Sequence, residues 1–346
     1  MAAIRNDSNP RPHISGVQPE AAIAGGEICI RGNGFASGDR MEGLTVLIGD
    51  LPAHPMIGSD SLVIVKVPEG ASDGELVVGQ GGALSETWSC DIGITVAENL
   101  HPVANPAVDT FGNIYTTFSG SRGQKVPVAV YRIDLNFNLR PFLNDMMNAT
   151  SIAIGPDGMI YISSRFDGTV YQVTPSGNMS IFVEGMGVAT GICFDEMGNL
   201  YVGDRSGTIF KVEPNRQIYV YATLEPSIAA YHLAWGPDQH LYVTGPTTSS
   251  FDSVYRVTPN GDVETFYRGL GRPQGMAFDA DGNLYISASW MGRKGVMRIR
   301  PDRTVEHFLS GPGIVGLAFL PSRAMIIATT NAIHRVDVDI RGYQPF

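Results

Sequence analysis

Several features that often define a protein class are scarce or absent in this chain of 346 residues. Cysteine occurs only as Cys29, Cys90 and Cys193, and no CxxC motif is present, which argues against a zinc ribbon and a thioredoxin-like centre. Cys29 and Cys90 could pair in an exported protein, although buried free thiols are the interpretation that we favour. No apolar run reaches the roughly 18 residues that a membrane-spanning helix requires.

Positive charge is also scarce. The chain has 24 Lys and Arg against 34 Asp and Glu, a net charge of −10, and no basic run. The chain therefore offers no obvious positively charged surface for nucleic acid or for an anionic membrane. Residues 1–11 lack the apolar segment of a signal peptide and are expected to form a flexible tail. These observations predict a cytoplasmic protein that binds neither nucleic acid nor membranes.

Glycine and proline are abundant, at 41 and 22 residues, which favours many short strands joined by turns. Six related units follow one another, such as "GICFDEMGNLY" and "GMAFDADGNLY", each of which predicts a β-hairpin. Further strands such as "TVYQVTP" and "VETFYRG" complete most units. Four strands in about 41 residues, repeated six times, predict a six-bladed β-propeller over residues 105–346. The aligned residues that end the six related units are Tyr115, Tyr161, Tyr201, Tyr242, Tyr285 and Ile326.

Two details of the propeller also follow from the repeats. Asp279, Asp281 and Asn283 resemble the start of a calcium loop, but Gly282 comes too early and strands flank the segment, so we predict a plain hairpin turn. The last unit ends with "GYQPF", which we predict to be its outer strand. The ring would then close by packing between the first and last blades, without a strand contributed from another part of the chain.

Residues 12–98 have a different pattern. About seven short strands with turn signals predict an immunoglobulin-like β-sandwich, and residues 99–104 form a linker to the propeller. The segment resembles an IPT/TIG domain, on the basis of Ile14, Pro19, the "IRGNGF" corner at 30–35, "VLIGD" at 46–50 and "VPEG" at 67–70. This resemblance implies a binding or spacing module, and hence a protein partner for the sandwich.

The six repeats resemble the NHL and SMP-30/gluconolactonase group of six-bladed propellers. In its lactonase branch this resemblance implies a divalent metal on the axis, held by Glu, Asn and Asp just before the first strands of the blades. The matching positions here lack a carboxylate or an Asn, and a hard cation needs several such oxygens. We therefore predict no metal and no other cofactor. The matching positions are Ala104, Thr150, Thr190, Tyr231, Gln274 and Val315.

The candidate site lies at the end of the propeller axis where the first strand of each blade begins. His232 replaces the Gly or Ser of sister units and could act as acid or base, or could fill the channel as a hydrogen-bonded group. Arg165 and Arg205 could clamp an anion or form an inter-blade ion pair. The predicted binding residues are Arg165, Asp204, Arg205, Tyr231, Gln274, Trp290, Asn105 and Ser151.

Two functions remain open on these residues. The first is a small-molecule hydrolase or related enzyme of the lactonase-like group, acting in the axial pocket through His232 without the usual metal ligands. The second is a non-catalytic propeller that binds a ligand or a protein. The missing carboxylates favour the second function, and the unusual polar residues on the axis favour the first.

Overall fold

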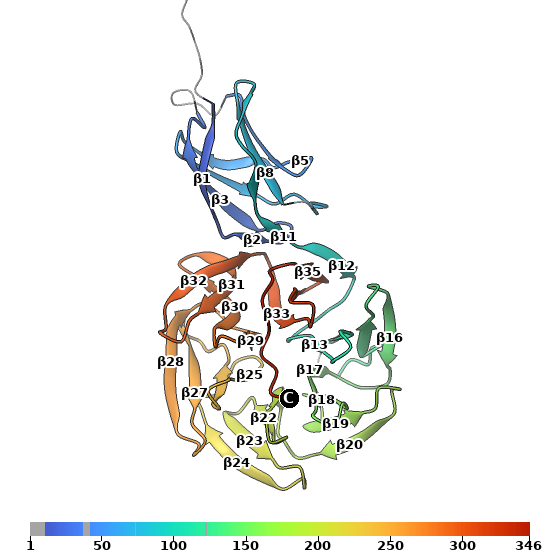
Figure 1. Cartoon of the computed structure of the whole chain (residues 1–346). Coiled ribbons are helices and arrows are strands. Elements are labelled where there is room, and N and C mark those ends of the chain that lie inside the picture. The colour runs from blue at the N-terminus through green and yellow to red at the C-terminus, as the bar shows by residue number, and fades with distance from the viewer. Residues whose placement is uncertain (1–10, 37–41, 73, 122) are drawn as a thin grey trace, which may run out of the picture. The chain divides into compact units, whose positions relative to one another are not determined.

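The computed structural model describes residues 11–36, 42–72, 74–121 and 123–346, and its regular elements are all strands (Figure 1). The all-β prediction is therefore confirmed. The described part of the chain contains no helix that could cross a membrane. Two compact units are present, one of residues up to 94 with 307–312, the other of residues 95–306 with 313–346. The predicted flexible tail, except Arg11, lies outside the described residues.

The first unit contains two sheets, with strand orders β1-β3-β7-β6 and β10-β8-β4-β5, and β9 pairs with β8. Two further strands, β2 and β11, form a short parallel pair. The strands are β1 (His13–Gln18), β2 (Ala21–Ala22), β3 (Glu27–Asn33), β4 (Leu44–Ile48), β5 (Leu51–Pro52), β6 (Pro55–Gly58), β7 (Leu62–Lys66), β8 (Glu75–Gln80), β9 (Ala83–Leu84), β10 (Trp88–Ser89) and β11 (Asp91–Ile92).

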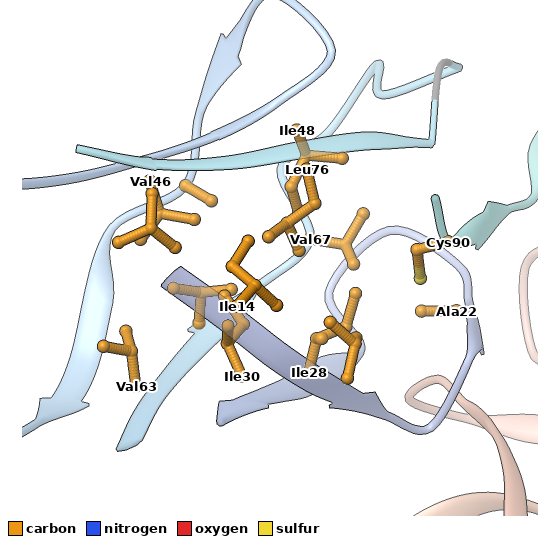
Figure 2. Close-up of a cluster of buried hydrophobic side chains, with 14 of the residues drawn as sticks. Ile14, Ala22, Ile28, Ile30, Val46, Ile48, Val63, Val67, Leu76 and Cys90 are labelled. Atoms are coloured by element: carbon orange, nitrogen blue, oxygen red, sulfur yellow. The ribbon is translucent and has the colours of Figure 1, made fainter. Parts of the chain in front are cut away.

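Side chains from both sheets form the core of this unit (Figure 2). Ile28 and Ile30 of β3 are fully buried, and Leu76 of β8 is buried in the same cluster. Alternate side chains of a strand point to the same face, which gives each sheet an apolar inner surface. Cys29 and Cys90 are buried free thiols, and the Cys90 Sγ donates a hydrogen bond to the Glu20 carbonyl at 3.0 Å.

The second unit is a ring of six blades (Figure 1). Blades one to three are β13 (Ala107–Val108), β14 (Ile114–Thr117), β15 (Val130–Ile133) and β16 (Leu139–Leu143); β17 (Ala149–Ile154), β18 (Ile160–Ser164), β19 (Thr169–Val173) and β20 (Met179–Val183); and β21 (Ala189–Phe194), β22 (Leu200–Asp204), β23 (Thr208–Val212) and β24 (Ile218–Thr223).

Blades four and five continue the same order. They are β25 (His232–Trp235), β26 (Leu241–Thr244), β27 (Asp252–Val257) and β28 (Val263–Leu270); and β29 (Met276–Phe278), β30 (Leu284–Trp290), β31 (Arg293–Ile299) and β32 (Val305–Ser310). Blade six contains β33 (Ile314–Phe319), β34 (Met325–Thr329) and β35 (Ala332–Val336).

The ring closes differently from our prediction. Strand β12 (Ile94–Glu98), which precedes the first blade, is hydrogen-bonded to β35 and completes blade six. Thr95 Oγ1 lies 3.1 Å from His334 Nδ1, and Leu100 N–H donates to the Asn331 carbonyl at 3.0 Å. The prediction of a ring closed without a strand from elsewhere in the chain is therefore wrong. The physical reason is that β35 would otherwise leave an unpaired edge at the outside of the blade.

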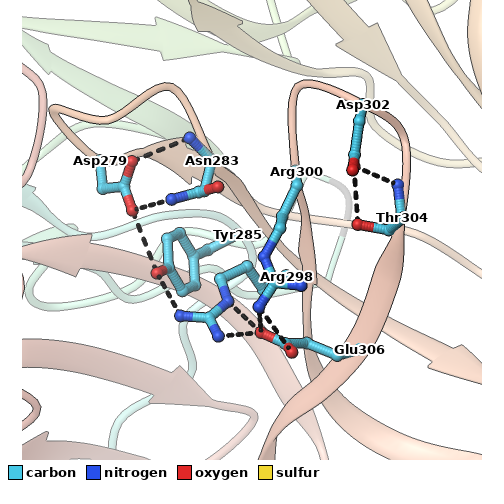
Figure 3. Close-up of polar contacts among 8 residues, drawn as sticks. All are labelled: Asp279, Asn283, Tyr285, Arg298, Arg300, Asp302, Thr304 and Glu306. Carbon is cyan, nitrogen blue, oxygen red and sulfur yellow. Dashed lines mark hydrogen bonds and ion pairs between the residues drawn. The ribbon is translucent and has the colours of Figure 1, made fainter.

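The Asp-rich turns stabilise the first hairpin of the blades (Figure 3). Asp279 accepts hydrogen bonds from Asp281 N–H, from the main chain and side chain of Asn283, and from the Tyr285 hydroxyl, at 2.8 to 3.1 Å. The same arrangement recurs in blades one and three. All these donors belong to the turn or to the strand that follows, so the carboxylate serves as the cap of a hairpin, as predicted.

Candidate functional site

A cavity of about 740 Å³ occupies the propeller axis at the end where the first hairpins of the blades turn. All six blades contribute to its wall, which is mainly apolar. The innermost strands reach the cavity with one small side chain each, at equivalent positions of the six repeats. We call these residues the small-residue ring: Ala107, Ala153, Cys193, Ala234, Ala277 and Ala318.

Aromatic contacts between neighbouring blades hold this wall in place. The residue after each ring position is often aromatic and packs against the repeat tyrosine of the preceding blade. The ring centroids of Tyr161 and Phe194 are 4.8 Å apart, and those of Tyr242 and Phe278 are 4.7 Å apart. Bulky side chains therefore fill the space between blades while small ones face the axis. The cavity exists because larger residues are absent from the ring.

The last ten residues of the sequence, 337–346, extend over the cavity, and we call them the C-terminal segment (dark red in Figure 1). Tyr343 N–H donates to the Phe278 carbonyl at 2.9 Å, and the Tyr343 hydroxyl donates to Glu196 Oε1 at 2.7 Å. The Phe346 ring lies 6.2 Å from that of Phe194. The segment thus links blades six, five and three. Our prediction that "GYQPF" forms an outer strand is wrong, because β12 occupies that place.

Charged groups at the cavity are few. The lining includes Asp109, Asp157 and Arg132. Asp109 accepts hydrogen bonds from Phe111 N–H, from the main chain and side chain of Asn113, and from the Tyr115 hydroxyl, at 2.8 to 3.3 Å. Asp157 likewise accepts from Met159, Tyr161 and Gln172. Both carboxylates are therefore engaged with their own blades.

His232 is the first residue of β25, at the end of the strand away from the hairpin turn, and it is not among the described residues that line the cavity. It is buried, and burial lowers the pKa of His232 from 6.5 to about 4. The imidazole is consequently neutral at neutral pH. Its neighbour Tyr231 is also buried and its hydroxyl donates to the Glu225 carbonyl. Tyr231 N–H donates to Thr190 Oγ1 of the preceding blade at 3.1 Å.

Asn105 and Ser151 hold neighbouring blades together. Asn105 Nδ2 donates to the Met276 carbonyl at 2.7 Å, and its Oδ1 accepts from Leu317 N–H at 3.1 Å, which joins blade one to blades five and six. Ser151 Oγ accepts from Ile192 N–H at 3.4 Å. Sequence reasoning missed Ser163 and Ser287, whose hydroxyls donate to main-chain carbonyls of the following blades.

The two predicted arginines contact loop carbonyls. Arg165 Nη2 donates to Ser119 Oγ at 3.3 Å and to the Gly120 carbonyl at 3.1 Å. Arg205 donates to the carbonyls of Ser227 and Ile228 at 3.2 and 2.8 Å. Asp204 is buried and accepts from Val188 N–H at 2.8 Å and from Ser206.

Trp290 and Gln274 belong to blade five. Trp290 Nε1 donates to the Tyr267 hydroxyl at 3.1 Å, and the indole packs at the edge of the blade core. Gln274 is half-buried, and its main-chain N–H donates to the Ser287 carbonyl at 2.8 Å. Of the predicted site residues, Asn105 is the one that lines the axial cavity in the described part of the chain.

The cavity residues that sequence reasoning missed had a recognisable signal. Every repeat has a small residue at the ring position, whereas the flanking positions are apolar and mostly large. Comparison of the six aligned units could have found this pattern. Within the described ranges, no group of three or more His, Cys, Asp or Glu is placed to bind a metal ion.

Comparison with known proteins agrees with this architecture. Residues 12–90 match the IPT/TIG domain family, which confirms the predicted resemblance of the first unit. No curated protein matches the chain in sequence. The chain therefore combines a segment that matches the IPT/TIG domain family with a six-bladed propeller.

Three solved structures illustrate the likeness. A gluconolactonase of Xanthomonas campestris is 14% identical with a TM-score of 0.58, over 71% of this chain and 90% of its own. An auxiliary nutrient binding protein of Bacteroides ovatus is 13% identical with a TM-score of 0.55, over 97% and 99%. Virginiamycin B lyase of Staphylococcus aureus is 13% identical with a TM-score of 0.51, over 70% and 96%. At these identities the likeness shows a shared fold.

Proposed function

We propose that the propeller is a binding module that takes a small, mainly apolar molecule into the axial cavity. The observation that carries this proposal is the cavity of about 740 Å³ behind the small-residue ring. Pockets for small molecules typically have about 300 to 1,000 Å³ and mostly apolar walls. The description of the Bacteroides ovatus relative as a nutrient binding protein is consistent with a binding role.

The polar residues on the axis support binding over catalysis. Asn105, Ser151 and Tyr231 already hydrogen-bond neighbouring strands or loops. A general base must come within hydrogen-bond reach of the proton that it removes. His232 is not among the residues that line the cavity in the described part of the chain, and it is buried.

The experiment uses the fluorescent apolar dye phenylnaphthylamine and the full chain. We expect saturable binding, and much weaker binding in Ala277→Phe, because a benzyl group at this ring position projects into the cavity and occupies part of the space that the dye needs. Ala229→Phe is the matched control, since Ala229 is also half-buried but lies outside the cavity lining. Equal binding by both variants and by the unchanged protein would show that the dye does not occupy the axial cavity.

Hydrolysis of a lactone or ester is the second candidate function. The fold that the chain shares with a gluconolactonase supports it, and His232, which is neutral at neutral pH, would be the candidate general base. Gluconolactone hydrolysis by the full chain, with and without added calcium, is the appropriate assay. Activity that His232→Gln abolishes at an unchanged melting temperature would support the enzyme. Absence of any His232-dependent turnover would leave the binding module as the function.

A further inference from the structure

One arginine at the cavity departs from the pattern of the other blades. In each blade, one residue of the third strand lies opposite the aligned Tyr or Ile that ends the repeat unit. This residue is basic in five blades: Arg132, Lys211, Arg256, Arg298 and Arg335 are paired with Tyr115, Tyr201, Tyr242, Tyr285 and Ile326. Only Arg132 of this set belongs to the cavity lining among the described residues.

In blades four, five and six the arginine at this position has a carboxylate partner. Arg256 forms an ion pair with Glu264, and Arg298 with Glu306 (Figure 3). Arg335 Nη2 lies 2.7 Å from Asp337 Oδ1. These carboxylates neutralise the guanidinium in each of the three blades.

Blade one has a second arginine where blade four has its glutamate. Arg132 on β15 lies opposite Arg140 on β16, as Arg256 lies opposite Glu264. Like charges directly opposite each other in a sheet are destabilising. Across the described ranges, neither arginine forms an ion pair with a carboxylate. Arg140 acts on Asp134, whose pKa it helps to lower, and Arg132 is hydrogen-bonded to Tyr115, whose hydroxyl donates to Asp109. The blade therefore places one guanidinium at the cavity wall without the direct carboxylate partner that the matching arginines of blades four, five and six have.

We propose that the molecule bound in the axial cavity carries an anionic group, which Arg132 binds at the cavity wall while Arg140 adds to the local positive charge. This inference rests on the proposed binding function and names its ligand class: an apolar body with one carboxylate, sulfonate or phosphate. A half-buried guanidinium suits this role, because it binds such oxygens with two parallel hydrogen bonds. Asp109 and Asp157 also line the cavity, and their oxygens accept hydrogen bonds from their own blades, so the anionic group would bind at Arg132 and away from these carboxylates.

Two dyes with the same aromatic body test this inference. Anilinonaphthalene sulfonate carries one negative charge, and phenylnaphthylamine carries none. We expect the sulfonate dye to bind more tightly to the unchanged protein. Arg132→Gln should weaken sulfonate binding about tenfold, since a hydrogen bond to a charged group contributes about that factor, and should leave the neutral dye unaffected. Arg140 is exposed, so solvent and salt screen its charge. Arg140→Gln should therefore weaken sulfonate binding only about two- to threefold.

Lys211→Gln is the matched control, because Lys211 has the same register in blade three but does not line the cavity in the described structure. It should change neither affinity. Circular dichroism and the melting temperature establish that each variant is folded. Equal affinities of the two dyes, or equal losses in Arg132→Gln and Lys211→Gln, would overturn the anion site while leaving the binding function intact. Failure of both dyes to bind would overturn the two proposals together.

Discussion

Acidification should destabilise the propeller through His232. Burial lowers the pKa of His232 from 6.5 to about 4, because the surrounding apolar atoms disfavour the charged imidazolium. In the unfolded chain the imidazole regains its ordinary pKa. Between these two values the unfolded chain binds more protons than the folded one, so the free energy of unfolding decreases as the pH falls.

The size of this effect follows from the two pKa values. The stabilisation by neutral His232 is fully present above about pH 6.5 and is lost as the pH falls toward 4. Between about pH 7 and about pH 5 the loss amounts to about 2 kcal/mol. His334, buried beside β12, also has its pKa lowered by burial to about 4 and adds a loss in the same direction.

Urea unfolding followed by circular dichroism at the two pH values measures this loss. His232→Gln should reduce the difference in unfolding free energy between the two pH values by about 2 kcal/mol, because glutamine does not titrate. His54→Gln, at an exposed position, is the control and should keep the full difference. If His232→Gln and His54→Gln show the same pH dependence, the imidazole is not neutral and buried in the folded chain.

The remaining predictions concern ring closure and the C-terminal segment. Ala97→Asp places a charge on β12 against the buried Ile333 cluster and should cost about 3 kcal/mol or more; an unchanged melting temperature would mean that β12 does not close blade six. Tyr343→Phe removes the hydrogen bond to Glu196 and should speed labelling of Cys193 by an aromatic disulfide about two- to tenfold, because the thiol lines the covered cavity. Tyr219→Phe removes an exposed hydrogen bond to Gln217 and is the control; equal labelling rates in the two variants would exclude a covering role for the segment.

The repeats were sufficient to predict the fold of the propeller. Each unit has its own hairpin turn and its own alternation of apolar residues, and these are local properties of the chain. The turn of Asp279, Asn283 and Tyr285 is an example, because all its partners lie within six residues. Ring closure was not predictable in this way. β12 is an ordinary short strand by sequence, and its partner β35 follows more than two hundred residues later.

For the candidate site too, the sequence predicted positions in the chain but not contacts between blades. The positions of His232, Asn105 and Ser151 at or near the starts of the first strands of their blades could be inferred from the repeats. Their contacts could not, because the Asn105 amide bonds strands of blades five and six that are distant in sequence. The sequence also did not predict the Arg132–Arg140 pair. The pair is recognisable only when the strand register shows that blades four and five have a glutamate where blade one has Arg140.

By itself, the sequence determined the all-β architecture, the six repeated units and the IPT/TIG domain, because periodicity and turn residues act over a few neighbouring positions. Only the tertiary structure decided where space remains on the axis. Six small side chains, one from each blade, make a cavity when the ring brings them together, and the C-terminal segment lies over that cavity through contacts with three blades. Such features depend on packing between residues far apart in the chain, which a local sequence pattern does not predict.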